Sequence, residues 1–213
     1  MVQYTFYYFP ARGRGEAIRH LLALSGKKWE NRVIALEEWP SFKGSMPLGQ
    51  IPVLEVDGVK IAQSVTILRF LGHQFHRAGK NAVECARLDM MAEVVQDLIN
   101  APFTSNYPRV LLGFPGFEHE DKHDYFKNKV LPELNQFAPI IEKFLVENGG
   151  NGVLIGDNET WVDVFAAETF SKFVDFGLKD ALDCYPNIQQ LISRVHSLQP
   201  IKHMIETRPP CPA

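Results

Sequence analysis

The sequence predicts an α/β domain followed by an all-helical domain. Strand-like apolar runs lie before residue 76, and Asp57-Gly58 between two of them indicates a two-residue hairpin turn, which needs the positive φ that Gly tolerates. After residue 83 no strand pattern appears, and apolar residues recur at helical spacing. We therefore predict an α/β domain at residues 1–76 and a helical domain at residues 83–207, with a polar linker between them.

Strands and helices alternate in the first part of the chain. The predicted elements, in order, are a strand at 3–8, a helix at 14–25, a strand at 29–34, a short helical or irregular piece at 39–45, the hairpin around Asp57-Gly58 and a helix at 64–75. Pro52 is predicted at the first residue of a strand, where its missing N–H does least harm. The order β-α-β-α-β-β-α resembles a thioredoxin-like domain, with parallel strands first and an antiparallel hairpin after.

The second part of the chain is predicted to be helical. We expect helices at 83–104, 119–147, 162–173, 186–198 and 201–207, with a loop at 107–117. Pro132 and Pro139 should kink or break the second of these helices. Thr160 and Asp163 have the spacing of a capping box for the third, with Asp in place of the usual Glu. Glu159 stands just before the cap, so we expect no apolar staple there.

Composition excludes several classes of function. The 213 residues are 46% hydrophobic and 22% charged, with a net charge of −3, so no basic field would hold nucleic acid or an anionic membrane. The apolar runs are too short to span a bilayer, and the N-terminus lacks a basic leader followed by an apolar stretch. Three widely spaced cysteines, Cys85, Cys184 and Cys211, form neither a disulfide framework nor a zinc site. We expect a cytoplasmic protein.

The segment from Gly49 to Ser64 predicts a binding site for a small peptide. If the Ile51-Pro52 bond is cis, the loop before the hairpin turns its free N–H and C=O groups outward, where an extended peptide can pair with them. Ser64 opens the next helix, and its hydroxyl and the first free N–H groups of the helix suit a carboxylate. A peptide edge beside an anion site indicates a peptide ligand with a free carboxylate.

The α/β domain contains no cysteine, because the first one in the chain is Cys85. Dithiol redox chemistry and a cysteine nucleophile are therefore excluded from the predicted site. If this domain handles a thiol, the ligand must supply it. A thiol with a pKa of about 8.5 is mostly protonated at neutral pH, and a hydroxyl donor aimed at the sulfur stabilises the thiolate and lowers that pKa.

Four segments, in order, resemble the cytosolic glutathione transferases, and most of all sigma-class members from nematodes. These segments are residues 4–14, 39–43, 49–58 and 61–64, and the resemblance covers essentially the whole chain. It implies an enzyme that conjugates glutathione thiolate to apolar electrophiles for detoxification. It also implies glutathione as co-substrate, no metal, and a homodimer.

The resemblance assigns roles to individual residues. Tyr8 and Arg14 stand where the family has its catalytic tyrosine and a supporting cation, although Tyr8 taken alone fits better as a core strand residue. Asp97 matches the acid that reaches the γ-glutamyl ammonium across the dimer interface, and a solvated helix charge is its alternative. The residues that the resemblance places on glutathione are Tyr8, Trp39, Lys43, Gly49, Gln50, Ile51, Pro52, Gln63, Ser64 and Asp97.

The walls of the electrophile pocket follow from the same resemblance, which implies an apolar second substrate. The candidate wall residues are Phe9, Pro10, Gly13, Met90, Val94, Leu98, Pro102 and Tyr107. Apolar residues at helical spacing lie more often in a core than in a pocket, so the alternative for the helical members is packing. Leu48 stands where some classes have an aromatic key to the partner subunit, which predicts a flatter and more polar dimer interface.

Other functions stay open beside conjugation. Some sigma-class members also isomerise prostaglandin H to prostaglandin D, and this activity is a candidate here. Other relatives carry haem or other flat apolar ligands, so a non-catalytic carrier is the alternative to an enzyme. His119, Glu120 and His123 match the zinc-protease pattern H-E-x-x-H, but their charged neighbours predict a wet surface in place of a dry metal site.

Overall fold

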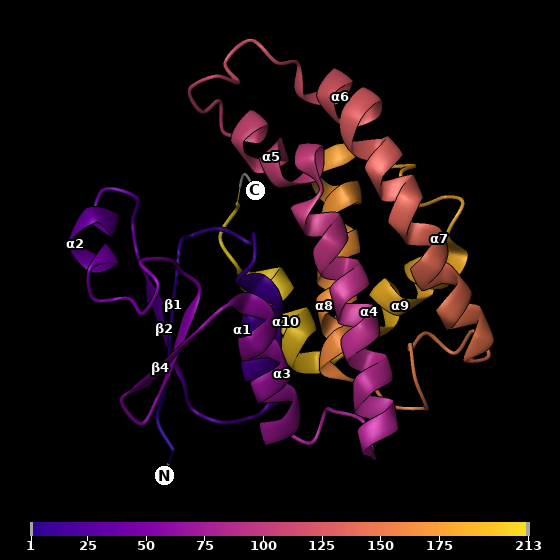
Figure 1. Cartoon of the computed structure of the whole chain (residues 1–213), viewed down its shortest axis with the longest axis horizontal. Helices are drawn as coiled ribbons and strands as arrows, with labels where there is room; N and C mark the ends of the chain where they lie inside the picture. Colours follow the sequence, from indigo (N-terminus) through magenta and orange to yellow (C-terminus); the bar gives the residue numbers. More distant parts are fainter. Residues whose placement is uncertain (1, 212–213) are drawn as a thin grey trace.

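A four-stranded mixed sheet forms the N-terminal domain of the computed structural model, which describes residues 2–211. The strands are β1 Tyr4–Tyr8, β2 Glu30–Val33, β3 Val53–Val56 and β4 Val59–Ala62, in the spatial order β2-β1-β3-β4. β1 pairs in parallel with β2 and antiparallel with β3, and β3 pairs antiparallel with β4. The predicted thioredoxin-like α/β domain is confirmed and lies on the left in Figure 1.

Helices cover both faces of this sheet. α1 (Glu16–Leu24) and α3 (Ser64–Gln74) pack together on the face toward the rest of the molecule, where both also contact α8 (Trp161–Lys172). The short α2 (Trp39–Lys43) lies on the opposite face, where Trp39 packs against a separate small core. The domain is therefore layered, with α2 outermost, then the sheet, then α1 and α3 against the second domain.

The hairpin turn forms as predicted. Asp57 (φ 47°) and Gly58 (φ 85°) both have positive φ, as the two-residue mirror-type turn requires. The Asp57 carboxylate accepts a hydrogen bond from the N–H of Gln3 at 2.8 Å, which ties the turn to the start of the chain. The Ile51-Pro52 peptide is cis. β3 begins at Val53, so Pro52 precedes the strand by one residue instead of opening it, because proline has no N–H to enter the ladder.

The second domain is helical throughout its described residues. Its helices are α4 Ala82–Asn100, α5 Pro102–Leu111, α6 Lys122–Tyr125, α7 Leu131–Glu147, α8, α9 Pro186–Ser197 and α10 Gln199–Thr207. Two π-helical turns accompany them, η1 Phe126–Val130 before α7 and η2 Phe173–Gly177 after α8. α8 runs through the centre of the molecule, contacts α1, α3, α4 and α9, and buries nearly all of its residues (Figure 1). None of the helices in the described part of the chain combines the length and apolarity needed to cross a membrane.

The prediction for the region between α4 and the loop at 112 is wrong in two places. The helix predicted at 83–104 stops at Asn100, because Ala101 precedes Pro102 and takes an extended ψ of 142°. The predicted loop at 107–117 contains the second half of α5. Buried Tyr107 and Val110 pack that half into the core, and the helix continues through Pro108.

The helix predicted at 119–147 begins three residues later than expected and contains a π-helical turn. The Asp121 carboxylate caps its first turn by accepting the N–H of Asp124 at 2.9 Å, so α6 starts at Lys122. η1 ends just before Leu131, and Pro132 occupies the first turn of α7. Pro139 lies inside α7 without ending it.

Candidate functional site

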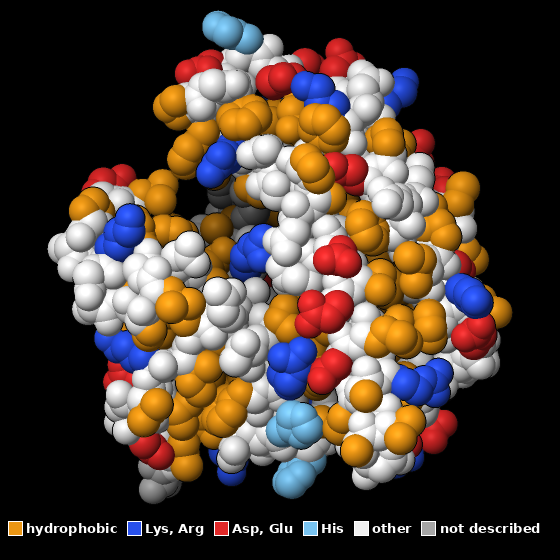
Figure 2. Space-filling model, in the orientation of Figure 1, with side chains coloured by type: hydrophobic (Ala, Val, Ile, Leu, Met, Phe, Trp, Pro, Cys, Tyr) orange, Lys and Arg blue, Asp and Glu red, His pale blue; other side chains and the backbone are white. Residues whose placement is uncertain are grey.

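A hollow lies between the lobe around α2 and the helical domain, and Figure 2 shows it at the upper left of the molecule. One cavity in this region, the loop cavity, measures about 540 Å³. Its lining residues are Phe9, Arg14, Trp39, Lys43, Leu48, Gly49, Gln50, Ile51, Pro52, Ala62, Gln63 and Ser64. Every residue predicted to hold the peptide is in this set except Tyr8 and Asp97.

The backbone at the entrance to β3 presents unpaired polar groups. In the part of the chain that the structure describes, neither the N–H nor the C=O of Ile51 has a hydrogen-bond partner. Ladder pairing with β1 and β4 starts only at Val53, beyond the cis-proline. An extended peptide can therefore add to this edge by main-chain hydrogen bonds.

Gln63 and Ser64 form the start of α3. Gln63 has φ 73° and ψ 117°, a backbone conformation that is rare outside glycine. Ser64 opens the helix as predicted, but it is the first helical residue and not the N-cap, and no side chain caps this end. The free N–H groups at the beginning of this 11-residue helix are left for another acceptor, which is the property of an anion site.

Trp39 and Lys43 lie on the α2 side of the loop cavity. The Trp39 ring meets the ring of Phe9 edge-on, with 5.7 Å between centroids, and this contact orients the indole. Lys43 ends α2 and lies against Gly49, where its Cε would be 3.6 Å from an added Cβ. An indole N–H and an ammonium are both donors that a ligand carboxylate can accept from.

The Tyr8 hydroxyl lies beneath the loop that follows β1. Tyr8 is 8% exposed, and its hydroxyl oxygen accepts the backbone N–H of Arg14 at 2.9 Å. Burial raises the pKa of Tyr8, while the N–H and the guanidinium of Arg14 oppose that shift. The phenol is therefore neutral near pH 7. Its oxygen is occupied as an acceptor, so its proton is available to a ligand sulfur.

Arg14 connects the two halves of the site, because it lines the loop cavity and also the neighbouring apolar cavity. Its Nη2 donates to the Oδ1 of Asn100 at 2.7 Å, which ties the loop after β1 to the end of α4. Burial lowers the pKa of Arg14, but a guanidinium keeps its charge in proteins. A fixed positive charge thus lies beside the Tyr8 hydroxyl.

The apolar cavity measures about 130 Å³ and lies between the loop after β1 and helices α4, α5 and α8. Both π-helical turns contribute walls to it, and such turns occur frequently at functional sites. Its lining residues are Gly13, Arg14, Ile99, Thr104, Ser105, Tyr107, Pro108, Leu111, Phe126, Val130, Thr169, Lys172, Phe173 and Phe176. The Tyr107 hydroxyl donates to the C=O of Phe176 at 2.7 Å, which fixes one wall.

The structure brings only some of the predicted electrophile-pocket residues to this cavity. Gly13 and Tyr107 line it. Phe9 lines the loop cavity instead, next to Trp39. Pro10 lies on the far side of the same loop, in a hollow formed with the C-terminal segment.

The prediction for the α4 wall is wrong. Leu98 is fully buried and Val94 packs against the same core, while Met90 is 45% exposed on the outside of the helix. Ile99 is the α4 residue that lines the apolar cavity, one position along from Leu98. Pro102 is exposed at the start of α5. The helical apolar face packs into the core, and the cavity takes its wall from the edge of that face.

Asp97 lies on the exposed surface of α4 and does not line the loop cavity. Within the described residues its carboxylate forms no hydrogen bond and no ion pair. Its predicted role, which the resemblance assigns across a dimer interface, stays a prediction.

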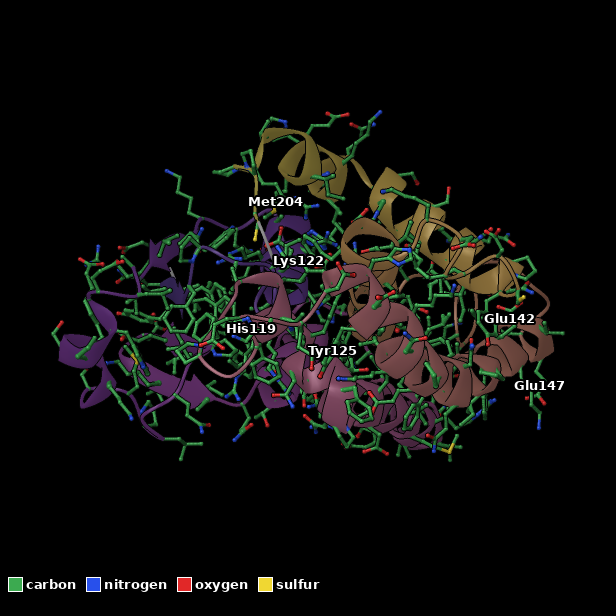
Figure 3. The ribbon with its side chains drawn as sticks, turned by 90° about the horizontal axis from the view of Figure 1, so that it is seen from above. His119, Lys122, Tyr125, Glu142, Glu147 and Met204 are labelled. Carbon is green, nitrogen blue, oxygen red and sulfur yellow. The ribbon has the colours of Figure 1, made fainter. Side chains whose placement is uncertain are left out.

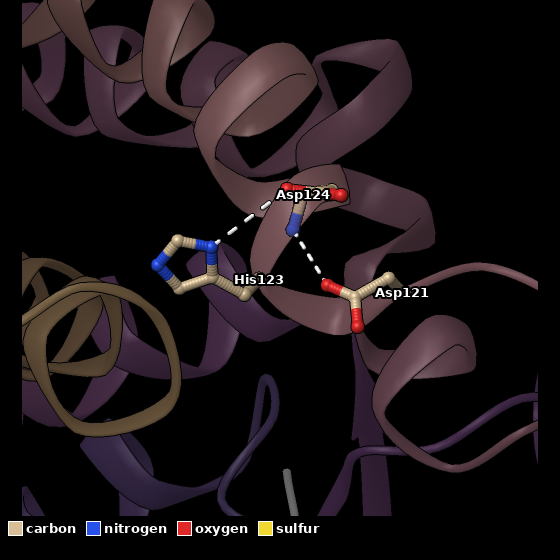
Figure 4. A group of neighbouring side chains, drawn as sticks. All are labelled: Asp121, His123 and Asp124. Atoms are coloured by element: carbon tan, nitrogen blue, oxygen red, sulfur yellow. Dashed lines mark hydrogen bonds and ion pairs between the residues drawn. The ribbon is translucent and has the colours of Figure 1, made fainter.

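The residues of the H-E-x-x-H pattern lie on the surface at the start of α6. His119 lies in the turn before the helix (Figure 3). His123 lies within the helix, so the two do not share one helical face. Asp121, His123 and Asp124 bring one ligand atom each within 4.8 Å of one another, and all three are exposed. Figure 4 shows that Asp121 caps the helix, while the Nδ1 of His123 lies 3.9 Å from the Oδ1 of Asp124.

Helix α8 contributes residues that sequence reasoning missed. Thr169 and Lys172 line the apolar cavity, and the Lys172 ammonium donates to the C=O of Gly13 at 2.7 Å. The available signal was a lysine at the end of a helix that is mostly apolar, which favours a cation placed where water is scarce.

These features describe a two-domain protein with a thioredoxin-like fold that can hold a peptide beside a buried tyrosine hydroxyl, with an apolar cavity adjoining. The family model described as the N-terminal domain of glutathione S-transferase matches residues 4–73, and that of the C-terminal domain matches residues 113–208. The chain belongs to the glutathione S-transferase family and is an enzyme of this class.

Relatives and solved structures agree with this assignment. A probable glutathione S-transferase of Caenorhabditis elegans, gst-36, is 54% identical over 213 residues and covers 100% of both chains. A solved monomeric glutathione S-transferase of the hookworm Necator americanus has a TM-score of 0.88, 36% identity and 98% coverage of both chains. A Nu-class enzyme of Haemonchus contortus has a TM-score of 0.85, 38% identity and 100% coverage of both. The prostaglandin synthase D of Nilaparvata lugens has a TM-score of 0.82 and 29% identity over 98% of this chain and 100% of its own.

The predicted likeness to nematode transferases is confirmed. The sigma class is not, since a Nu-class enzyme is also similar.

Proposed function

We propose that this enzyme conjugates the thiolate of glutathione to apolar electrophiles, with the peptide in the loop cavity and the electrophile in the apolar cavity. The observation that carries the proposal is the position of the Tyr8 hydroxyl. The Tyr8 hydroxyl accepts the N–H of Arg14, and Arg14 lines both cavities. Gly13 lines the apolar cavity, and an added Cβ there would lie 2.5 Å from the hydroxyl oxygen. A hydrogen bond donated by the Tyr8 hydroxyl therefore stabilises a thiolate at the place where the two ligands meet.

In this proposal the thiolate attacks the electrophilic carbon and Tyr8 stays unmodified. The Ile51 edge pairs with the cysteinyl unit, while Lys43 and Trp39 hold the glycyl carboxylate. The N-terminus of α3 with Gln63 and Ser64 receives the γ-glutamyl carboxylate. The Arg14 guanidinium adds a positive field that favours the sulfur anion.

The test is the rate of glutathione conjugation to 1-chloro-2,4-dinitrobenzene, measured across pH for the wild type and for Tyr8→Phe. We expect Tyr8→Phe to lower kcat/KM by about 100-fold, as removal of one anion-stabilising donor does, and to raise the apparent pKa of the bound thiol. Tyr7→Phe is the matched control, because its hydroxyl bonds Glu55 at 3.2 Å, away from both cavities, and its rate should stay unchanged. A wild-type rate equal to the uncatalysed rate would overturn the proposal. It would leave the carrier of haem or other apolar ligands as the alternative, which haem titration would measure.

We propose a sigma-like class and a homodimer as the finer assignment. The Tyr8 and Arg14 arrangement and the prostaglandin synthase among the similar structures support a sigma-like enzyme, with isomerisation of prostaglandin H to prostaglandin D as a second activity to assay by product chromatography. The exposed, unpaired Asp97 supports a dimer in which it binds the γ-glutamyl ammonium of the partner subunit's ligand. Light scattering measures the assembly, and Asp97→Asn should raise KM for glutathione alone. A cytoplasmic location and a role in detoxification belong to the same proposal, since the cytosol keeps thiols reduced.

A further inference from the structure

The apolar cavity contains a cation that the conjugation of an apolar electrophile does not use. Lys172 is the last residue of α8, and its ammonium reaches the cavity wall beside Gly13. The C=O of Gly13 accepts one of its hydrogens at 2.7 Å. An ammonium has three donors, so two remain without an acceptor among the described residues.

No carboxylate neutralises this cation inside the cavity. Among the described lining residues Arg14 and Lys172 are positive, and none is Asp or Glu. Neither cation has a carboxylate within ion-pair distance in the described part of the chain. Glu168 and Asp175 both accept from Arg12, at 2.9 Å and 2.6 Å, and Glu168 attracts the Lys172 ammonium without an ion-pair contact. Both charged side chains that line the cavity are therefore positive, and the other lining residues are mostly aromatic and aliphatic.

A buried hydroxyl without a partner lies one helical turn from Lys172. Thr169 also lines the cavity, is only 2% exposed, and its Oγ1 has no hydrogen-bond partner among the described residues. Residues three apart on a helix share a face, so Thr169 and Lys172 present an unused hydroxyl and an underused ammonium together. A buried polar group of this kind is costly unless a ligand satisfies it.

We propose that the electrophile of this enzyme carries a carboxylate, and that Lys172 and Thr169 bind it. This inference rests on the proposed function and names the substrate class of the same cavity. The carboxylate supplies the negative charge that the cavity lacks and accepts the spare donors of the ammonium and the hydroxyl. Charge-assisted hydrogen bonds of this kind gain strength between apolar walls, where water screens little. The other end of the ligand then lies toward Gly13 and the Tyr8 hydroxyl.

The test compares 4-chloro-3-nitrobenzoate with its methyl ester. In both reactions the C–S bond forms, the C–Cl bond breaks, chloride leaves with the bonding pair, and the thiol proton goes to solvent. Each kcat/KM is divided by the uncatalysed rate constant with glutathione at the same pH, which removes the difference in intrinsic reactivity. We expect the normalised wild-type values to favour the carboxylate by about tenfold or more, which corresponds to one charge-assisted hydrogen bond.

Variants at Lys172 distinguish the effect of losing the positive charge from the effect of disturbing the structure. Lys172→Met should reduce the preference for the carboxylate to about one, and Lys172→Arg should keep most of it. A loss of loop position through the Gly13 contact would lower both substrates equally and leave their ratio unchanged. Lys179→Met is the matched control, because Lys179 is exposed beyond η2 and lines neither cavity. Its ratio should equal that of the wild type.

The results that would overturn this inference differ from those that would overturn the proposed function. Conjugation of the ester with no preference for the carboxylate would overturn the inference and leave the transferase activity standing. A preference that survives in Lys172→Met would also overturn it. If neither compound is conjugated, the rate with 1-chloro-2,4-dinitrobenzene decides the proposed function, which fails when that rate too equals the uncatalysed rate. Calorimetric titration of 3-nitrobenzoate against methyl 3-nitrobenzoate then decides the inference, because tighter binding of the anion supports it and equal or weaker binding rejects it.

Discussion

At the scale of single residues, the shape of the loop after β1 explains how a tyrosine can serve as a donor. Two glycines allow the backbone to pass over the Tyr8 ring. A Cβ on Gly13 would approach the hydroxyl oxygen to 2.5 Å, and a Cβ on Gly15 would overlap the ring itself. This close passage brings the Arg14 N–H onto the phenol oxygen at 2.9 Å. The Tyr8 oxygen thus accepts a hydrogen bond from the loop, and its O–H stays available to donate to the ligand.

The first prediction concerns Gly15. Gly15→Ala should push the Tyr8 ring aside, because its new Cβ overlaps the ring although the backbone (φ −99°, ψ −26°) suits alanine. Overpacking of this kind costs about 1–3 kcal/mol of unfolding free energy. A displaced catalytic group costs about 100-fold in kcat/KM. Urea unfolding and the conjugation assay measure the two effects.

Gly44→Ala is the matched control for this change. Gly44 also has helical dihedral angles (φ −68°, ψ −20°), and no atom lies within 4 Å of an added Cβ. Its unfolding free energy should stay within about 0.5 kcal/mol of the wild type. Equal activity of Gly15→Ala and wild type would show that the ring position is not critical.

At the scale of secondary-structure elements, the sequence predicts what local pattern determines and misses what packing determines. Strand alternation and Asp57-Gly58 identified β1 and the hairpin, because turn chemistry and period are local. Most of the lining of the loop cavity could be predicted for the same reason, since it lies in one nearly continuous stretch of the chain. The electrophile walls could not. Leu98 and Ile99 are adjacent apolar residues of one helix, yet one is core and the other lines a cavity, and only the positions of α5 and α8 decide between them.

The capping box of α8 shows a local pattern that the structure bears out. The Asp163 carboxylate accepts the N–H and the hydroxyl of Thr160, both at 2.7 Å, and the Thr160 hydroxyl lies 3.5 Å from the N–H of Asp163. The residue before the cap, Glu159, forms an ion pair with Arg194 of α9 at 2.7 Å. As predicted from Glu159, the cap has no apolar staple at that position, and this ion pair to α9 takes its place.

The second prediction is that Thr160→Ala destabilises the protein by about 1–2 kcal/mol, the usual cost of losing an N-cap hydroxyl. Thr160 is 7% exposed, so water cannot replace the lost group. Urea unfolding measures the change, and Thr160→Ser should recover most of it because it keeps the hydroxyl. Thr66→Ala, at an exposed position of α3, should change stability by less than about 0.5 kcal/mol. A Thr160→Ala effect as small as that of Thr66→Ala would contradict the role of the cap.

At the scale of the whole molecule, one buried ionic cluster joins the loop after β1 to α8 of the second domain. Arg12 lies in the loop after β1, and its guanidinium points to α8. There it donates to both oxygens of Glu168 at 2.9 Å and 3.1 Å and to the hydroxyl of Ser171 at 2.8 Å. The next loop residue, Gly13, accepts from Lys172 of the same helix. The loop that carries the Tyr8 contacts is therefore positioned by the second domain as much as by the first, and activity should depend on how the domains dock.

The third prediction concerns this cluster. Arg12→Met should cost about 3–5 kcal/mol of unfolding free energy, because it leaves Glu168 buried without its principal partner. Arg12 is 3% exposed and Glu168 is 1% exposed, so solvent cannot compensate. Conjugation activity should fall together with stability, since the same contact holds the loop after β1 on α8. Urea unfolding at several pH values and the conjugation assay measure both effects.

The pH dependence identifies the cause of this loss. Burial alone would raise the pKa of Glu168, but Arg12, His20 and Lys172 oppose it and lower the pKa from 4.5 to about 2. A carboxyl whose folded pKa is depressed contributes stability that is complete above pH 4.5 and is lost as the pH falls from there toward 2. Without Arg12 the buried carboxyl takes up a proton more readily, so the difference in unfolding free energy between Arg12→Met and wild type should shrink on acidification.

Arg69→Met is the matched control, because Arg69 also joins the domains. It pairs with Asp89 of α4 at 2.8 Å, and the two side chains are 32% and 41% exposed. An exposed pair contributes about 0–1 kcal/mol, so Arg69→Met should cost little at any pH. Equal losses for the two variants, or an Arg12→Met loss that does not change with pH, would show that the buried charge of Glu168 is not what the cluster stabilises.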